Sequence, residues 1–262
     1  MIRENAVIDL RPHSTEISYF DRAGDSTPIL FLHGLGNAAS NFDAMLANRS
    51  LAQHRLVALD FPGCGDSPYP LNQNRNIDDL VDLVDGFVAH LQLPKFLLVG
   101  ASMGGLVGLL YAERRSDQIV GFVNVEGNLA PEDCMFSRLV VPHPYEHFCD
   151  SILPRIKASL RAADETGATE HLKVLETADP RAYYDYSFQT VDYSDNAQLL
   201  NRFMSLPVAQ HFVYGSRNRQ LSYLPALRES SCRVTEIANA GHFLFYDAPD
   251  AFAECVRMAV QG

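Results

Sequence analysis

The chain of 262 residues is long enough for one large domain, or for a core domain with an insertion. Its 47% of hydrophobic and 20% of charged residues are typical of a globular protein, and no apolar run approaches the roughly 18 residues that a membrane-spanning helix needs. The net charge of −11 argues against nucleic acid and against an anionic membrane surface as partners.

The first part of the chain predicts short strands and one amphipathic helix. Residues 11–14 are expected to form a turn and residues 41–47 a short helix. Asn76 is an expected N-cap; apolar residues then recur with the helical period as far as Leu91, and Pro94 closes this helix. Apolar segments predict strands at residues 6–10, 16–20, 28–32 and 55–60.

The second part alternates strand and helix, with one long interruption. An apolar strand over residues 96–99 enters the turn Gly-Ala-Ser-Met-Gly at residues 100–104, and an apolar helix then runs to about Arg115. From Asn128 to about Pro207 the alternation of strands stops, and this polar, tyrosine-rich stretch is expected to be helical in places. The remaining predicted elements are a strand at 118–125, helices at 152–163 and 168–177, strands at 210–214 and 233–237, and helices at 223–229 and from Pro249.

This order predicts an α/β fold with a doubly wound, mostly parallel sheet. Residues 1–127 and 208–262 are expected to form the core domain. Residues 128–207 are too long for an ordinary connection, and we expect them to form a helical cap. The cap would cover the carboxyl edge of the sheet, where open α/β sheets bind ligands.

Cysteine, histidine and N-terminal patterns indicate the compartment and the cofactors. The five cysteines are scattered without a C-x-x-C pair and predict free thiols in a reducing compartment. Residues 1–5 lack the character of a secretory signal, so a cytoplasmic location is expected. The nine histidines show no metal-ligand spacing, so neither a metal nor another cofactor is expected. The oligomeric state does not follow from the sequence.

Ser102 stands at the apex of the strand–turn–helix at residues 100–104. Such a turn lifts its central side chain out of the sheet, requires small neighbours, and directs the free N–H groups of the following helix toward it. A serine hydroxyl becomes a nucleophile only when a base removes its proton. The turn therefore predicts a nucleophilic serine with a histidine partner elsewhere in the chain.

Four motifs occur in the order and spacing of one known family. They are His-Gly-Leu-Gly at residues 33–36, Asp-Phe-Pro-Gly-Cys-Gly-Asp-Ser at 60–67, the serine turn at 100–104 and Gly-His at 241–242. With them the chain resembles the α/β-hydrolase family over nearly its whole length. The resemblance implies Ser102 as nucleophile and His242, in the loop after the last strand, as base. His33 belongs to the neighbouring loop and is expected to be structural.

The acid of the triad departs from the pattern that the resemblance implies. Most family members carry an aspartate where this chain has Asn218, and no acidic residue occurs at positions 213–228. An asparagine cannot supply the charge that stabilises an imidazolium. Glu126, at the end of the strand after the serine helix, is therefore expected to be the acid, as in some lipases and dehalogenases of this fold. The alternative is an exposed or salt-bridged strand end. Asp247 is expected to cap the last helix.

The oxyanion hole is expected from the backbone N–H groups of Met103 and Leu35. Their side chains are candidates for lining the acyl pocket. An aromatic cluster in the predicted cap allows two interpretations: a wall over the site, or packing of the cap onto the core. It consists of Tyr183, Tyr184, Tyr186 and Phe188.

These features predict a serine hydrolase that cleaves an ester, thioester or lactone of a small, mostly apolar acid through an acyl-enzyme. Its partner is a small-molecule substrate. One alternative is C–C bond hydrolysis or haloperoxidase-like activity, which use the same triad within the family. Another is a ligand receptor with little turnover. Dehalogenase and epoxide-hydrolase chemistry are disfavoured, because those relatives carry an aspartate in place of Ser102.

Overall fold

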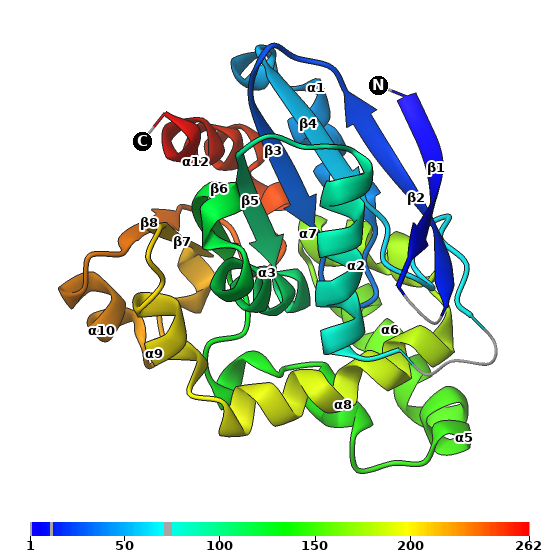
Figure 1. The fold of residues 1–262 in the computed structure, drawn as a ribbon. Coiled ribbons are helices and arrows are strands. Elements are labelled where there is room, and N and C mark those ends of the chain that lie inside the picture. Colours follow the sequence, from blue (N-terminus) through cyan, green and yellow to red (C-terminus); the bar gives the residue numbers. More distant parts are fainter. Residues whose placement is uncertain (1, 11–12, 71–74, 262) are drawn as a thin grey trace.

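The computed structural model describes residues 2–10, 13–70 and 75–261. One sheet of eight strands, in the order β1-β2-β4-β3-β5-β6-β7-β8, runs through the molecule (Figure 1). The first two strands are antiparallel to their neighbours, and all later pairs are parallel, so the predicted fold class is confirmed. The strands are β1 (Ile2–Asp9), β2 (Ser14–Arg22), β3 (Ser26–Leu32), β4 (His54–Leu59), β5 (Phe96–Ala101), β6 (Ile119–Val125), β7 (Ala209–Gly215) and β8 (Arg233–Ile237).

The strands β1 and β2 extend beyond the apolar segments that predicted them. They pair in register from Ile2–Asp21 to Asp9–Ser14, because main-chain hydrogen bonding continues where the side chains are polar. Of the turn expected at residues 11–14, positions 11 and 12 lie outside the described residues.

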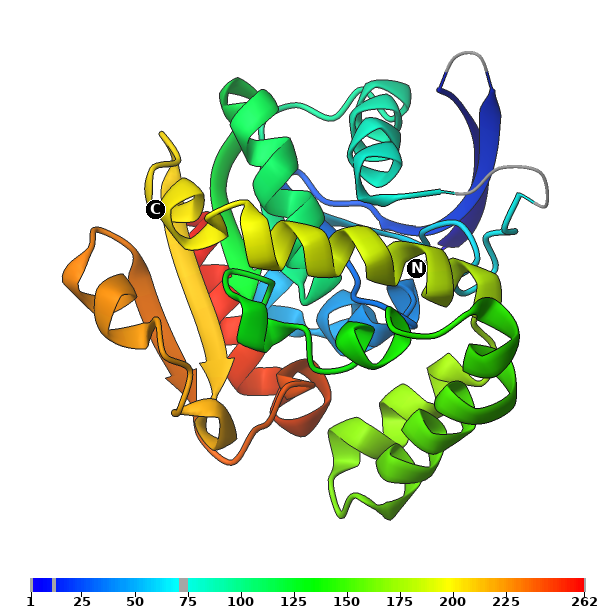
Figure 2. The ribbon, with the colours of Figure 1, turned by 90° about the horizontal axis from the view of Figure 1, so that it is seen from below.

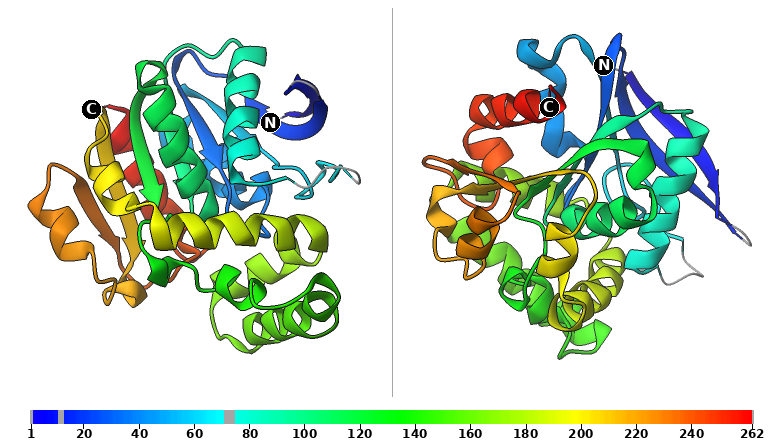
Figure 3. Two further views of the ribbon diagram at one scale, coloured as in Figure 1. Left: turned by 60° about the horizontal axis from the view of Figure 1, so that its bottom comes forward. Right: turned by 60° about the vertical axis from the view of Figure 1, so that its left-hand side comes forward.

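Two apolar cores lie on the two faces of the sheet. In β3, Leu30 and Leu32 belong to one core, whereas Ile29 and Phe31 belong to the other, since successive strand side chains point to opposite faces. Helices α2 (Ile77–His90) and α3 (Met103–Arg114) contribute to the first core. Helices α1 (Asp43–Ala47) and α12 (Pro249–Val260) contribute to the second. Figure 3 shows α2 and α12 on opposite sides of the sheet.

The expected N-cap of α2 is confirmed. The Asn76 side chain accepts a hydrogen bond from the Asp79 N–H at 3.1 Å, and the Asp79 carboxylate accepts one from the Asn76 N–H at 2.9 Å. This reciprocal pair satisfies two N–H groups at the helix start. The start of α2 is thus determined by residues that are close together in the sequence.

The segment between β6 and β7 consists of helices and lies beyond the carboxyl ends of the central strands (Figures 1 and 2). The predicted helices at 152–163 and 168–177 correspond to α6 and α7, while the longest helix of the segment, α8, was not predicted. Besides short 3₁₀ turns and a π-helical turn at Phe148–Ile152, the segment contains α4 (Ser137–Val140), α5 (Tyr145–His147), α6 (Leu153–Ala162), α7 (Thr166–Leu175), α8 (Pro180–Asn196) and α9 (Leu199–Met204).

Two members of the aromatic cluster of α8 pack the helical segment onto the core. Tyr183 and Tyr186 are buried, and the Tyr186 hydroxyl donates to the Pro62 carbonyl at 2.8 Å. None of the four cluster residues lines the cavity that contains Ser102. Of the two interpretations of this cluster, the structure therefore favours packing.

Two short helices complete the fold. Helix α10 (Leu224–Glu229) connects β7 to β8, and α11 (Leu244–Asp247) lies between β8 and α12.

Candidate active site

Ser102 occupies the turn between β5 and α3 with φ +52° and ψ −124°, a conformation that a residue with a side chain rarely adopts. Two glycines make the turn possible. A Cβ on Gly100 would lie 2.3 Å from the Gly104 carbonyl oxygen, and a Cβ on Gly104 would lie 2.3 Å from that of Leu32. The turn thereby presents a partly exposed Ser102 at the carboxyl edge of the sheet.

The loop after β3 lies directly against this turn. A Cβ on Gly34 would stand 3.0 Å from the Ser102 Cβ, so any larger residue would have to displace the serine turn slightly. Leu35 and Met103 line the same cavity as Ser102. Neither of their N–H groups donates a hydrogen bond to a described residue, which leaves two main-chain donors beside the serine.

His33 holds this loop to the next one, as expected for a structural residue. Its Nδ1 donates to the Gly34 carbonyl at 2.8 Å, and its Nε2 accepts from the Phe61 N–H at 2.9 Å. Burial lowers the pKa of His33 to about 4, so the ring is neutral and its two nitrogens keep distinct roles.

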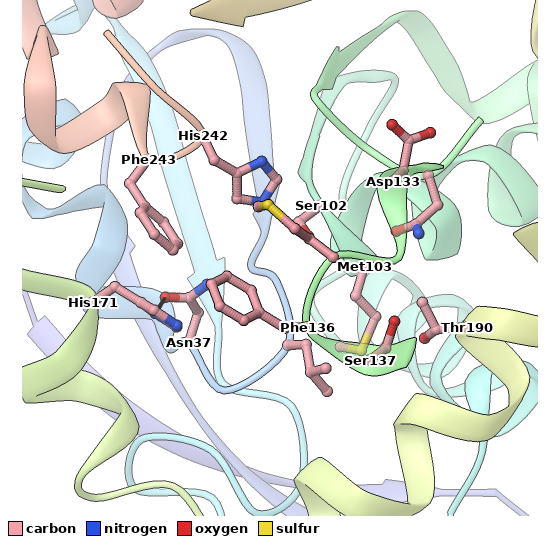
Figure 4. A pocket seen from close by; sticks show the side chains of 13 residues that line it. Asn37, Ser102, Met103, Asp133, Phe136, Ser137, His171, Thr190, His242 and Phe243 are labelled. Carbon is pink, nitrogen blue, oxygen red and sulfur yellow. Dashed lines mark hydrogen bonds between the residues drawn. The ribbon is translucent and has the colours of Figure 1, made fainter. Parts of the chain in front are cut away.

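His242 follows β8 and lines the cavity together with Ser102 (Figure 4). Its Nδ1 lies 2.8 Å from Glu126 Oε2. Because a carboxylate only accepts, Nδ1–H is the donor and Nε2 is left free to take a proton. Burial acts to lower the pKa of His242, but the hydrogen bond and charge of Glu126, with the charge of Asp133, outweigh it and raise this pKa.

Glu126 directly follows β6, with its backbone in the left-handed region at φ +43° and its side chain only 5% exposed. Three further hydrogen bonds hold the carboxylate: the Gly215 N–H donates to Oε1 at 2.8 Å, and Asn218 Nδ2 lies 3.0 Å from Oε1 and 2.8 Å from Oε2. The residue at the family's usual acid position thus binds the carboxylate from the neighbouring strand. The sequence offered one signal for this contact: an amide, Asn218, stands at the usual acid position while a carboxylate, Glu126, stands at the end of the neighbouring strand.

The expectation that Asp247 caps the last helix is wrong. Its Oδ1 accepts from the Gly167 N–H at 2.8 Å, in the first turn of α7, and its Oδ2 accepts from the Gly241 N–H at 2.9 Å. The last helix begins with Pro249, which has no N–H to offer, whereas α7 presents free N–H groups there. Asp247 therefore ties the loop of His242 to the helical segment.

The cavity at Ser102 measures about 30 Å³ and is walled by four parts of the chain. The loop after β3, the serine turn, the helical segment and the loop after β8 all contribute (Figure 4). Sequence reasoning missed the polar residues of the helical segment at this place. The lining residues are Leu35, Asn37, Ser102, Met103, Asn128, Asp133, Met135, Phe136, Ser137, His171, Thr190, His242 and Phe243.

Asp133 is one of these missed residues and also lines a second crevice with Glu126 and His242. Burial raises its pKa to about 6, against hydrogen bonds from the Leu129 and Ala130 N–H groups and the Tyr223 hydroxyl. Those three donors occupy the carboxylate, so Asp133 orders the start of the helical segment beside the site.

The described residues contain neither a cluster of metal-binding side chains nor a membrane-spanning helix. Residues 2–10, 13–70 and 75–261 hold no group of three or more His, Cys, Asp or Glu side chains that could bind a metal ion. In the same residues, no helix has both the length and the hydropathy needed to cross a membrane.

The sequence pattern of the alpha/beta hydrolase family matches residues 29–255, and the chain belongs to this family. Haloalkane dehalogenase 2 of Mycobacterium bovis is 25% identical over 264 aligned residues, covering 92% of this chain and 90% of that protein.

Two solved structures share the fold. An esterase from Exiguobacterium antarcticum superimposes with a TM-score of 0.79 at 17% identity, covering 99% of this chain and 100% of that one. The enol-lactonase from Burkholderia xenovorans superimposes with a TM-score of 0.78 at 22% identity, with the same coverage of both chains. The predicted family and fold are both confirmed.

Proposed function

We propose that this protein is a serine hydrolase that cleaves an ester, thioester or lactone of a small, mostly apolar acid. One observation carries the proposal: His242, which lines the cavity with Ser102, donates its Nδ1–H to the buried Glu126 carboxylate at 2.8 Å. A base oriented in this way next to a serine on a tight turn is the arrangement that activates a hydroxyl nucleophile.

In the proposed reaction the Ser102 Oγ attacks the substrate carbonyl carbon, and His242 Nε2 takes the hydroxyl proton. Glu126 stabilises the resulting imidazolium, while the Leu35 and Met103 N–H groups bind the oxyanion. His242 then gives the proton to the leaving alcohol, thiol or hydroxyl group, whose bond to the carbonyl carbon breaks. Water, activated by the same histidine, releases the acid and regenerates Ser102.

The cavity supports a short acyl group. Apolar side chains of Leu35, Met103, Phe136 and Phe243 line it. Its volume of about 30 Å³ leaves room for only a small group while the helical segment stays in place. We therefore assign residues 128–207 the role of a cap that moves to admit substrate, with residues 1–127 and 208–262 as the catalytic core.

Ser102 also separates the proposed reaction from dehalogenation. A haloalkane dehalogenase is among the relatives. The family resemblance implies an aspartate at the position of Ser102 in dehalogenases, and this chain has a serine there. A serine ester intermediate fits acyl transfer instead, and an esterase and a lactonase share the fold.

The test is hydrolysis of short-chain nitrophenyl esters in the burst phase and the steady state. We expect the wild-type protein to turn over acetate or butyrate esters, Ser102→Ala to abolish both phases, and Glu126→Gln to slow both. Glu146→Gln, an exposed glutamate of the helical segment, is the matched control and should retain wild-type rates. If Ser102→Ala turns over esters at the wild-type rate, the proposal is contradicted. If the wild-type protein turns over no ester, the proposal is also contradicted, and the alternative of a ligand receptor is favoured.

A further inference from the structure

A second histidine lies in the cavity and has no part in the reaction described above. His171 belongs to α7 in the helical segment, is only 1% exposed, and lines the cavity together with Ser102 and His242. Figure 4 shows it on the same side as Asn37 and Phe243.

The ring of His171 is anchored on two sides by residues next to the proposed catalytic groups. Its Nδ1 lies 2.7 Å from Asn37 Oδ1, two positions after Leu35 in the chain. Its ring stacks on Phe243, with centroids 4.4 Å apart and planes at 24°, and Phe243 directly follows His242. A ring clamped between these two loops has a defined position relative to the reacting serine.

The anchoring also determines which ring nitrogen of His171 is left without a hydrogen-bond partner. Because the Asn37 oxygen accepts, the proton is on Nδ1 and Nε2 is a bare acceptor. Burial, and next the charge of His242, lower the pKa of His171 to about 3, so the ring stays neutral. Among the described residues no group donates to this Nε2, and it is not one of the unpaired side-chain atoms that are fully shielded from solvent, so it remains accessible to a small ligand.

We propose that His171 Nε2 recognises a hydrogen-bond donor on the substrate, a hydroxyl or N–H group close to the scissile carbonyl. This inference rests on the proposed function for its setting, and it deepens the substrate class to hydroxylated or N–H-bearing esters. A ligand that covers this acceptor without offering it a donor leaves it buried and unpaired at a cost in free energy, whereas a ligand with a donor satisfies it. Substrates with the donor are therefore selected over analogues that lack it.

The donor belongs either to the acyl part or to the alcohol part of the substrate, and two matched pairs distinguish these sources. The first pair compares the nitrophenyl ester of butyric acid with those of its monohydroxylated analogues. The second compares propyl butyrate with hydroxyethyl butyrate, which has nearly the same length. We expect kcat/KM to favour the hydroxylated member of one pair by about three- to tenfold, the usual contribution of one hydrogen bond.

Three variants test whether His171 causes this preference. His171→Phe keeps a ring on Phe243 but removes the acceptor, and the preference should fall toward one. His171→Gln restores a side-chain acceptor and should recover part of the preference. His147→Phe changes an exposed histidine of the same segment and should keep the preference in full. Thermal unfolding of each variant establishes that it is folded.

Binding to the Ser102→Ala protein provides a measurement that does not depend on turnover. Calorimetry should give tighter binding of the preferred hydroxylated ester, and this difference should vanish when His171→Phe is added. If no ester is turned over but this difference is found, the recognition role stands and the proposed function fails. If esters are turned over without preference, or if the preference survives His171→Phe, the recognition role fails and the function stands. Equal binding of both esters, or no binding of either, also overturns it.

Discussion

Glu126→Gln tests the departure from the family's usual acid position most directly. Three N–H donors converge on the two carboxylate oxygens, from Gly215, Asn218 and His242, at 2.8 to 3.0 Å. A glutamine has one acceptor oxygen and one NH₂ group, so at least one of these donors would face another donor. The substitution therefore removes the negative charge and leaves either the His242 Nδ1–H or the Gly215 N–H facing an NH₂ group, although it barely changes the side-chain volume.

The expected fall in kcat follows from the loss of the negative charge of Glu126 beside the imidazolium. Replacing the aspartate of a serine protease triad by asparagine lowers kcat by about 10⁴-fold, and Glu126 holds its histidine by the same Nδ1–H···O contact. We therefore expect kcat for a nitrophenyl ester to fall by roughly 10³- to 10⁴-fold. A fall of that size corresponds to roughly 4 to 5.5 kcal/mol of transition-state stabilisation.

The pH profile separates this role from a general loss of structure. His242 must be neutral to act as base, so kcat/KM falls as the pH drops through its pKa. Glu126 raises this pKa in the wild-type protein, and its removal should shift the acid limb toward lower pH. A kcat within tenfold of wild type, with an unmoved acid limb, would falsify the assignment of Glu126 as the acid.

Three further substitutions test the surroundings of the site. Asn218→Ala removes two hydrogen bonds to Glu126 and should lower kcat by about 10- to 100-fold with little change in KM; unchanged kcat would mean that Gly215 and His242 alone hold the carboxylate. Asp247→Ala leaves two N–H groups without an acceptor and should lower the free energy of unfolding by about 1–3 kcal/mol, measured by urea unfolding; an unchanged midpoint would contradict the link between α7 and the His242 loop. Gly104→Ala places a Cβ 2.3 Å from the Leu32 carbonyl oxygen, so we expect little folded protein on expression, and a wild-type melting temperature would refute the close approach.

Much of the fold could be predicted from the sequence because it is encoded locally. The buried runs of β3 and β5 and the N-cap at Asn76 each depend on residues close together in the chain. The turn at Ser102 belongs to the same class, since its glycines and its strained backbone lie within five consecutive residues. The length of β1 and β2 was underestimated, because main-chain pairing with a partner strand needs no apolar pattern.

The site depends on contacts between distant parts of the chain, and there the sequence was only a partial guide. The lack of an acid at position 218 indicated Glu126 by elimination, but only the tertiary structure reveals that Asn218 binds that carboxylate. Asp247 was assigned to its neighbouring helix because capping is usually local, whereas its partners lie on α7 and at Gly241.

The position of His171 in the cavity could be recognised only from the tertiary structure. Nothing in the local sequence of α7 distinguishes it from a buried helix residue, and its partners Asn37 and Phe243 are far away in the chain. The sequence by itself determined the strands, the serine turn and the family, because these follow from short-range sterics and hydrophobic periodicity. Only the tertiary structure decided which polar atoms surround Ser102, because that depends on how the helical segment packs over the edge of the sheet.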